Sequence, residues 1–540
     1  MVEESNYAMC ESIGVVVNTS TRLARTIVRQ ILEAGITDVV ISPGSRNAPL
    51  TMAFYEASKK NLIHLHTRID ERTAAFFALG ITKATNRPVP IVCTSGTAVA
   101  NFHPAVLEAS HSNSPLLVIT ADRPAELRRT GANQTTEQAG IFGKAVRYFA
   151  DISGPAYPMI LPLNSLRSGP VHLNVQFAEP LVADDDSNWL AELKINPPVD
   201  FNRKSPGTFY TKSTRGILVV GHDRAGFTVD EVKKFAAELK WPLISEDPLS
   251  FENAIPHASI FLSSQTITDE VAPDTVVVIG RTTLSRPINR LIAKARKTIV
   301  IDPRILTVDS ERKADQKFTS LPVVEVPPID VEYLERWQKF ADRASKKLAG
   351  LTNWSEALIA REIGASLRSG VSLFIASSRP IRDIEGFASP RDGVETFANR
   401  GLAGIDGNIS TALGIASQRK ETIAVLGDLS FLHDITGLIN DEDINLKIIV
   451  IDNNGGGIFS TLSHRGADGF ESIFGTPHNL DLAKVASGLG LQVSTVTEQS
   501  QLISELSKPI VGISVVVVSA PNRESNADNL QTIFNSMDSM

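Results

Sequence analysis

Cysteine is almost absent from the sequence. Its 540 residues include two cysteines, Cys10 and Cys93, which are too few for a disulfide framework and lack the spacing of a metal site. No apolar run reaches about 18 residues, the length at which a membrane-spanning helix becomes a candidate. The first residues, MVEESNYAMCES, are acidic and contain no apolar signal core. We therefore expect a cytoplasmic, soluble protein without a membrane span.

Excess positive charge and nucleotide-binding motifs are missing as well. The 53 lysines and arginines do not balance the 60 aspartates and glutamates, the formal net charge is −7, and no basic block stands out. General affinity for nucleic acid is therefore not expected, although local basic pockets for small acidic molecules are compatible with this balance. A P-loop pattern is absent, and GHDRAG at 221–226 lacks the middle glycine of a dinucleotide-binding fingerprint. The sequence thus gives no signal for a P-loop, nicotinamide or flavin site.

Length and hydrophobic periodicity predict several α/β domains in series. At about 150 residues per domain, a chain of 540 residues holds roughly three. Alternating strand and helix patterns form three blocks, separated by stretches richer in proline, serine and charge. We predict domains at 1–183, 215–345 and 352–540, with a linker at 184–214. The expected fold class is α/β, with three doubly wound parallel-sheet domains in series.

The first predicted domain illustrates the periodicity. The stretch STRLARTIVRQILEAG is amphipathic, and we expect its helix to begin after a cap at Thr19 or Ser20 and to stop at Gly35. Further helices are expected at 71–85 and 98–110. The intervening strands, such as PIVCT and PLLVIT, are uniformly apolar. Such strands indicate a parallel sheet that is covered on both faces.

Two apolar strands of the third predicted domain end in polar residues. One strand breaks at Gly427 into Asp428, and the next strand along the chain runs into Asn453, Asn454 and three glycines, the first of which is Gly455. Glycine-rich strand ends let backbone N–H groups approach a phosphate, and Mg²⁺ bound to a diphosphate prefers oxygen ligands. The side chains of Asp428 and Asn453 and the carbonyl of Gly455 fit that set. On spacing alone, an ordinary strand-end turn with an Asx cap fits equally well.

The pairing of Gly-Asp with a downstream asparagine-rich strand end resembles the diphosphate–Mg²⁺ motif of thiamine-diphosphate enzymes. In that superfamily one α/β domain holds the diphosphate and another supplies a glutamate to the aminopyrimidine ring. Glu71, after an expected strand and before an expected helix, is similarly placed, although a carboxylate at a helix start also faces the helix dipole. The chain resembles the menaquinone-pathway branch of the superfamily through eight stretches in the same order: ISPGSRNAPLT, DERTAAFFALG, CTSGTAVANFHPAVLEA, TADRPAEL, GANQT, ANRGLAGIDGNIST, GDLSFLHD and NNGGGIFS.

This resemblance implies a pyrimidine-binding, a middle and a diphosphate-binding domain in that order, with thiamine diphosphate and Mg²⁺ or Mn²⁺ as cofactors. It implies a transferase, an acyl-transferring carboligase that decarboxylates 2-oxoglutarate and adds the succinyl carbanion to isochorismate in a Stetter-type conjugate addition. Glu71 is then expected to donate a hydrogen bond to the pyrimidine ring, so that the imino form of the cofactor removes the thiazolium proton. Ile405 is expected to hold the cofactor in its bent shape.

The residues around the cofactor follow from the same resemblance. The implied metal ligands are Asp428, Asn453 and the carbonyl of Gly455. The implied cofactor contacts are Glu71, Ile405, Gly427, Asp428, Leu429, Ser430, Asn453, Gly455, Gly456, Ile458 and Phe459.

Both implied substrates are acidic, so their pocket needs guanidinium groups with bidentate geometry. Arg382 and Arg400 are expected to act beside Glu71 as catalytic residues. The implied substrate-binding residues are Ser45, Arg46, Arg123, Asn133, Gln134, Arg286, Ser378 and Leu462. Arg286 is a departure, because many relatives carry lysine there. Its charge is the same, but its reach and fork geometry differ.

Two other functions compete with this interpretation. A related thiamine-diphosphate decarboxylase or carboligase, similar to acetohydroxyacid synthase, would use pyruvate and would have no use for Arg382 and Ser378 at the distal end of the donor. A non-catalytic, ligand-sensing scaffold of the same fold could lose its activating carboxylate freely. The intact set of Glu71, Asp428 and Asn453 argues against that scaffold.

The resemblance also implies a homodimer, or a dimer of dimers, with active sites shared between subunits. A regulatory anion site is a separate prediction from the residues. Arg281 and Arg304 each follow an apolar strand, where they would lie on the same sheet edge, and Arg87 belongs to the first predicted domain. These arginines are predicted either to be ordinary surface residues or to bind an acidic aromatic product, such as dihydroxynaphthoate, as a feedback inhibitor.

Overall fold

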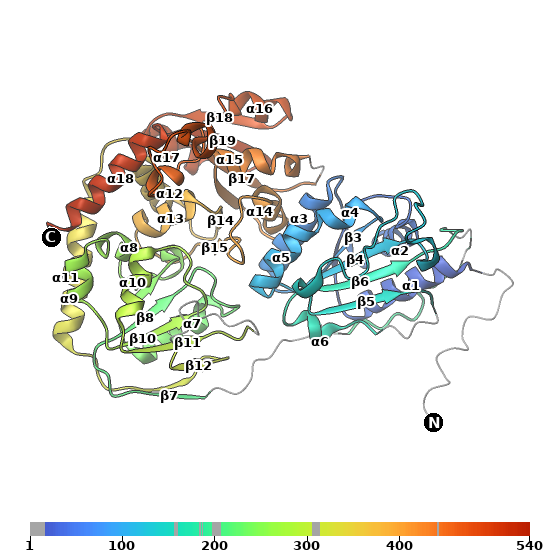
Figure 1. The fold of residues 1–540 in the computed structure, drawn as a ribbon, viewed down its shortest axis with the longest axis horizontal. Coiled ribbons are helices and arrows are strands. Elements are labelled where there is room, and N and C mark those ends of the chain that lie inside the picture. Colours follow the sequence, from blue (N-terminus) through green and yellow to red (C-terminus); the bar gives the residue numbers. More distant parts are fainter. Residues whose placement is uncertain are drawn as a thin grey trace. The chain divides into compact units, whose positions relative to one another are not determined.

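The structure, a computed structural model, describes residues 17–155, 160–182, 185, 187–196, 207–304, 314–439 and 442–539. The described strands form two six-stranded sheets, one five-stranded sheet and one pair (Figure 1). The chain divides into two compact units. The first comprises Met1–Ala78, Arg87–Val106 and Pro115–Asp200, and the second comprises Leu79–Asn86, Leu107–Ser114 and Phe201–Met540.

The first unit contains a six-stranded sheet in which every printed pairing is parallel. Its strands, in spatial order, are β2 (His64–Thr67), β1 (Asp38–Ile41), β3 (Val89–Cys93), β4 (Leu116–Asp122), β6 (Val171–Gln176) and β5 (Tyr148–Ile152). The helices that follow its strands include α2 (Ala48–Lys59), α3 (Glu71–Thr85), α4 (Thr97–Asn101), α5 (His103–Ser112) and α6 (Leu163–Leu166). Strands β1, β3, β4 and β6 are buried along their whole length, as expected for a sheet covered on both faces.

Two helix boundaries in this part of the chain differ from the sequence prediction. Helix α1 (Thr19–Glu33) is capped by Asn18, whose side chain accepts a hydrogen bond from the backbone N–H of Thr21 at 2.8 Å. The predicted cap at Thr19 or Ser20 is therefore wrong. The single helix predicted at 98–110 is two helices, α4 and α5. Pro104 lies in the first turn of α5, where its missing N–H is harmless but would interrupt a continuous helix.

The second unit contains the five-stranded sheet, again with parallel pairings. Its order is β12 (Gln316–Phe318), β11 (Lys297–Ile301), β10 (Thr275–Ile279), β8 (Gly216–Val220) and β9 (Leu243–Ser245). The helices of this region are α7 (Val229–Leu239), α8 (Ala258–Phe261), α9 (Gln265–Glu270), α10 (Arg286–Lys294) and α11 (Val331–Ala349). Part of the predicted linker forms β7 (Thr208–Tyr210), which pairs with β13 (Val323–Glu325).

The second six-stranded sheet also lies in the second unit (Figure 1). Its order is β15 (Glu395–Phe397), β14 (Ser372–Ile375), β16 (Thr422–Gly427), β17 (Leu446–Asp452), β19 (Ile513–Ser519) and β18 (Gln492–Val496), with parallel pairings. Its helices are α12 (Glu356–Ser366), α13 (Arg379–Phe387), α14 (Asn408–Ala416), α15 (Asp428–His433), α16 (Leu482–Gly488), α17 (Gln499–Ser507) and α18 (Arg523–Met537).

The two six-stranded sheets share one topology. Counted along the chain, each has the spatial order second, first, third, fourth, sixth, fifth strand. The α/β class with parallel, doubly wound sheets is confirmed. The predicted domain boundaries stay predictions. Within the second unit, one buried cluster contains residues of both sheets, including Val276 and Leu373. No helix among the described residues is long and apolar enough to cross a membrane.

Candidate functional site

Strand β16 is followed by an aspartate, Asp428, whose carboxylate accepts hydrogen bonds from the surrounding backbone. Gly427 caps helix α15, and Asp428 is the first residue of that helix. One carboxylate oxygen of Asp428, Oδ1, accepts the N–H of Leu429 at 2.6 Å, and the other, Oδ2, accepts the N–H of Gly455 at 2.7 Å. Asp428 is buried, and burial raises its pKa to about 6 although both backbone hydrogen bonds lower it. A buried carboxylate of this kind is suited to a cation.

The glycine-rich turn after β17 reaches Asp428 through an unusual backbone. Asn454 has a φ of +61° and Gly455 has a φ of +135°, both in the region that favours glycine. A Cβ atom on Gly455 would lie 2.1 Å from the carbonyl oxygen of Gly475, so only glycine fits there. This close approach brings the Gly455 N–H to Asp428 and leaves the Gly455 carbonyl with one backbone partner, Gly457.

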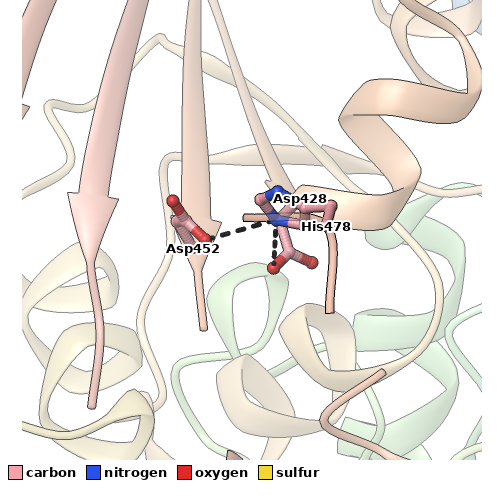
Figure 2. Close-up of side chains that lie close together, drawn as sticks. All are labelled: Asp428, Asp452 and His478. Atoms are coloured by element: carbon pink, nitrogen blue, oxygen red, sulfur yellow. Dashed lines mark hydrogen bonds and ion pairs between the residues drawn. The ribbon is translucent and has the colours of Figure 1, made fainter. Parts of the chain in front are cut away.

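His478 completes this group, although no motif in the sequence points to it. Its Nε2 atom lies 3.3 Å from Asp428 Oδ2 and 3.6 Å from Asp452 Oδ1. Dashed lines mark both contacts in Figure 2. The N–H of Leu480 donates to His478 Nδ1 at 3.0 Å, so Nδ1 is an acceptor and the ring proton belongs on Nε2. His478 therefore donates a hydrogen bond to Asp428 and does not present a free lone pair. It is not suited to be a metal ligand in this arrangement, even though the three side chains are close together.

The remaining lone pairs fit a hard divalent cation. A carboxylate offers about four acceptor positions, and Asp428 uses two on Oδ2, for Gly455 and His478, and one on Oδ1, for Leu429. Asn453 Oδ1 is buried without a hydrogen-bond partner. The free position on Asp428, the orphaned amide oxygen of Asn453 and the Gly455 carbonyl form an oxygen-only set, which is the donor chemistry that Mg²⁺ and Mn²⁺ prefer. The predicted ligands thus fit the implied metal.

The predicted cofactor residues near this set are tied to one another. The carbonyl oxygen of Ile405 accepts hydrogen bonds from Asn408 Nδ2 at 2.9 Å and from Ser430 Oγ at 3.1 Å, which connects the Ile405 turn to α15. The Ile405 side chain is exposed, which leaves it accessible to a ligand. Ile458, Phe459 and Leu462 follow the glycine-rich turn in and around a short 3₁₀ helix, Phe459–Thr461.

The loop before Ile405 is held by a buried carboxylate of the same compact unit. Glu108 accepts the N–H of Gly401 at 2.7 Å and the N–H of Leu402 at 2.6 Å. Successive backbone N–H groups form a concavity that binds an anion, and here a side chain of the protein fills it. Glu108 was not predicted, because the contact joins positions 293 residues apart.

Arg382 and Arg400, which are predicted to act on the 2-oxoglutarate substrate, both belong to the second unit and are close enough for their charges to interact. Arg400 donates to Thr283 Oγ1 at 2.7 Å, and Arg382 donates to the carbonyl of Ser378 at 2.7 Å. Burial lowers the pKa of Arg400, as does the charge of Arg382, while Glu246 opposes the shift. Ser378 has a φ of +76° at the cap of α13, a strained conformation for a non-glycine residue.

The predicted residues of the first unit gather at the carboxyl end of its sheet. Arg123 donates to Ser95 Oγ at 2.7 Å and to the carbonyl of Gln134 at 2.5 Å. Burial, followed by the charge of Arg46, lowers the pKa of Arg123, so the two guanidinium groups are close enough to interact. Ser45 and Asn133 are exposed. Ser95 was not predicted.

Glu71 stands apart from these arginines in its contacts. It begins α3, is half-buried, and its Oε2 lies 3.4 Å from Asn101 Nδ2. The preceding Asp70 caps the helix by accepting the N–H of Arg72 at 2.9 Å. Asp70 therefore caps the helix, and the Glu71 carboxylate is not used for capping.

The arginines of the predicted regulatory site already have partners. Arg304 is buried and forms ion pairs with Asp223 and Asp302. Arg281 donates to the carbonyls of Gly401 at 2.6 Å and His111 at 2.9 Å. Neither is an ordinary surface arginine, and neither offers an idle guanidinium group. Arg87 lies in the first unit, Arg286 is exposed at the start of α10, and the roles predicted for all four stay predictions.

Three family models match the chain in succession. Residues 21–141 match the N-terminal thiamine pyrophosphate (TPP) binding domain of thiamine pyrophosphate enzymes. Residues 184–375 match the middle domain of these enzymes, and residues 386–519 match their C-terminal TPP binding domain.

Curated relatives match nearly the whole chain. A 2-succinyl-5-enolpyruvyl-6-hydroxy-3-cyclohexene-1-carboxylate synthase from Nocardioides sp. is 39% identical and covers 95% of this chain and 98% of its own length. Synthases with the same name from Thermobifida fusca and Lysinibacillus sphaericus are 37% and 34% identical and cover 92% and 93% of this chain and 94% and 96% of their own lengths.

Proposed function

The chain belongs to the family of 2-succinyl-5-enolpyruvyl-6-hydroxy-3-cyclohexene-1-carboxylate synthases, and from this membership we propose that it decarboxylates 2-oxoglutarate and joins the succinyl unit to isochorismate in menaquinone biosynthesis. The observation that carries the proposal is the orphaned amide oxygen of Asn453, which follows β17, together with the buried carboxylate of Asp428, which follows the neighbouring strand β16. An unpaired buried oxygen is costly without a ligand. Its place at the carboxyl edge of a doubly wound sheet is where such folds bind ligands.

Each group of residues has a part in this reaction. Thiamine diphosphate, when bound, supplies the stabilised carbanion chemistry. Asp428, Asn453 and the Gly455 carbonyl would hold Mg²⁺ or Mn²⁺, and the turn from Gly455 to Phe459 would contact the cofactor. Glu71 would hold a proton toward the pyrimidine ring, and Ile405 would support the bent shape of the cofactor.

The cationic groups orient the two acidic substrates. Ser378 and Arg382 bind the distal carboxylate of 2-oxoglutarate, and Arg400 acts nearby. Arg46 and Arg123 bind the carboxylates of isochorismate, with Ser45, Asn133 and Gln134. Arg286, at the start of α10, and Leu462 also contribute to substrate binding. Bidentate guanidinium contacts fix direction as well as charge. We place the enzyme among the transferases and in the cytoplasm.

Product formation tests the function directly. Protein, thiamine diphosphate, Mg²⁺, 2-oxoglutarate and isochorismate are incubated together, and mass spectrometry is used to find the coupled product and the released CO2. We expect both with 2-oxoglutarate and neither when pyruvate replaces it. Glu71→Gln is the matched control, because its amide keeps the shape but not the acid. Coupling with pyruvate, or no coupling with either donor, would contradict the proposal.

Shared active sites are tested by subunit mixing. Glu71→Gln and Asp428→Ala subunits are each expected to be inactive, whereas a mixed dimer has one undamaged site if the two residues come from different subunits. Activity is measured after subunit exchange has been verified with two affinity tags. Absence of recovery in the exchanged dimer excludes a site shared in this way.

A further inference from the structure

A buried glutamate contacts the amide side of Asn453. Glu356 is the first residue of α12, and its Oε1 atom accepts a hydrogen bond from Asn453 Nδ2 at 2.5 Å. Both residues are buried. They are 97 residues apart in the chain, so the contact exists only because α12 packs near the end of β17. None of the motifs in the sequence points to Glu356.

This contact determines which side-chain atom of Asn453 faces away from Glu356. An amide can be turned over so that its oxygen and nitrogen exchange places. The turned form would set Asn453 Oδ1 against Glu356 Oε1, two acceptors at hydrogen-bond distance. The carboxylate therefore keeps Nδ2 on its own side and Oδ1 on the opposite side, where that oxygen has no partner among the described residues. Gly457 lies against the same nitrogen, because a Cβ atom there would come within 2.5 Å of Asn453 Nδ2.

The second oxygen of Glu356 faces the helix that carries the donor-binding residues. Glu356 Oε2 lies 3.6 Å from Arg379 Nε, and Arg379 also pairs with Asp383 on the next turn of α13. The Arg379 guanidinium pairs with this oxygen, and a carboxylate in an ion pair is an acceptor at both oxygens. Ser378 and Arg382 lie on either side of Arg379 in the sequence. Glu356 thus connects the predicted metal ligand Asn453 to the start of α13.

We infer that Glu356 is the positioning residue of the cation site: its carboxylate fixes the side-chain amide of Asn453 so that the oxygen, and not the nitrogen, is presented to a divalent cation. This inference rests on the proposed function, because that function assigns Asn453 as a ligand. A partner behind a metal ligand fixes ligand orientation, and loss of such a partner commonly lowers metal affinity about 10- to 100-fold.

The inference is tested by exchanging the hydrogen-bond donor and acceptor between positions 356 and 453. Glu356→Gln can turn its amide nitrogen toward Asn453 and reverse the asparagine, so we expect Mn²⁺ affinity to fall about 10- to 100-fold. In the double variant Glu356→Gln, Asn453→Asp, the glutamine nitrogen donates to one aspartate oxygen and the other oxygen faces the cation. The glutamine oxygen remains available to Arg379. We expect the double variant to bind Mn²⁺ within about tenfold of the unaltered protein, tighter than Glu356→Gln.

Binding is measured without turnover. Mn²⁺ is titrated into the full-length protein with thiamine diphosphate, and electron paramagnetic resonance follows the free ion. Glu362→Gln is the control, because Glu362 is a buried, arginine-paired carboxylate of the same helix that does not contact Asn453. It is expected to lower the thermal midpoint and leave Mn²⁺ affinity unchanged.

The outcomes separate this inference from the proposed function. Equal affinity of the unaltered protein and Glu356→Gln, or a double variant no better than Glu356→Gln, overturns the role of Glu356 and leaves the cation site in place. Equal losses in Glu356→Gln and Glu362→Gln also overturn it, since the effect would be one of stability. Absence of Mn²⁺ binding by the unaltered protein overturns both the inference and the cofactor site of the proposed function.

Discussion

The fourth strand of each six-stranded sheet ends in an aspartate, Asp122 in β4 and Asp452 in β17. In the first sheet the carboxylate of Asp122 accepts hydrogen bonds from Arg128 at 2.7 Å and Asn174 at 3.0 Å, so its charge is used internally. The following residue, Arg123, then makes that edge cationic.

The edge of the other six-stranded sheet has the opposite character. Its third strand leads into Asp428, and among the described residues neither Asp428 nor Asp452 pairs with a lysine or arginine. A histidine N–H and backbone N–H groups surround these oxygens instead. The same strand order therefore yields an edge suited to acidic substrates in one sheet and an edge suited to a cation in the other. The strand order determines where the side chains converge. The presence or absence of an arginine partner for the aspartate determines whether that sheet edge keeps a negative charge.

The largest expected effect comes from filling the glycine turn of the anionic edge. Gly455→Ala places a Cβ atom 2.1 Å from the Gly475 carbonyl and moves the N–H away from Asp428. Overpacking against backbone costs about 1–3 kcal/mol or more, and the positive φ adds about 1–2 kcal/mol. We expect affinity for thiamine diphosphate, measured by calorimetry with Mg²⁺, to fall at least about 100-fold.

Gly466→Ala is the matched control for that turn. Gly466 has a φ of +81° but no atom within 4 Å of a Cβ position. It carries the conformational penalty without the collision, so cofactor affinity should change less than about tenfold. Equal losses in both variants would mean that backbone strain, and not the approach to Gly475, controls the site.

The cationic edge is tested by removing its central charge. Arg123→Ala should raise the KM for isochorismate about 10- to 100-fold, because a hydrogen bond to a charged group contributes about 1.5–3 kcal/mol. The affinity for Mg²⁺ should not change, since the proposed metal ligands follow strands of the other sheet. Arg129→Ala, which removes an exposed ion pair with Glu137 in the following loop, should alter the KM by less than about threefold. A change in Mg²⁺ affinity in Arg123→Ala would contradict the division of tasks between the sheets.

A smaller effect is expected at the histidine behind Asp428. His478→Ala removes the Nε2–H donor and should weaken Mn²⁺ binding about tenfold. His478→Gln keeps a donor at the same distance along the side chain and should bind Mn²⁺ more tightly than the alanine variant. If the histidine itself were a ligand, glutamine would be no better than alanine, and the loss would be larger in both. Electron paramagnetic resonance of Mn²⁺ distinguishes these results.

The smallest effect concerns stability of the first sheet. His172 is buried on β6, packs against Phe142, and burial lowers its pKa to about 3. His172 takes up a proton near pH 6.5 in the unfolded chain but only near pH 3 in the folded chain. The contribution of His172 to the unfolding free energy is therefore fully present above pH 6.5 and is lost as the pH falls toward about 3. We expect the unfolding free energy of the transition that includes this sheet to fall by about 0.7 kcal/mol from pH 7 to pH 6 on account of His172.

Chemical denaturation at the two pH values measures this difference. His172→Gln should abolish that share of the pH dependence, whereas His64→Gln, at an exposed position, should not. An unchanged pH dependence in His172→Gln would show that another group is responsible.

Local patterns in the sequence were sufficient to predict the parallel sheets and the points where two strands end in polar, glycine-rich turns. Uniformly apolar strands predicted burial on both faces, and the break at Gly427 predicted the position of Asp428, because strand periodicity and turn chemistry depend on near neighbours. The cap at Thr19 or Ser20 was wrong because Asn18, one residue earlier, has a side chain that reaches the N–H of Thr21.

Only the tertiary structure decided how the ligand set is oriented. The proton on His478 Nε2 depends on the N–H of Leu480, and the direction of the Asn453 amide depends on Glu356, which belongs to a different helix. A hydrogen bond of this kind requires two groups within about 3 Å, and packing of helices on the sheet, not spacing along the chain, brings them that close. The sequence by itself therefore determined which oxygens stand at the sheet edge, and the folded chain determined which of their lone pairs remain free.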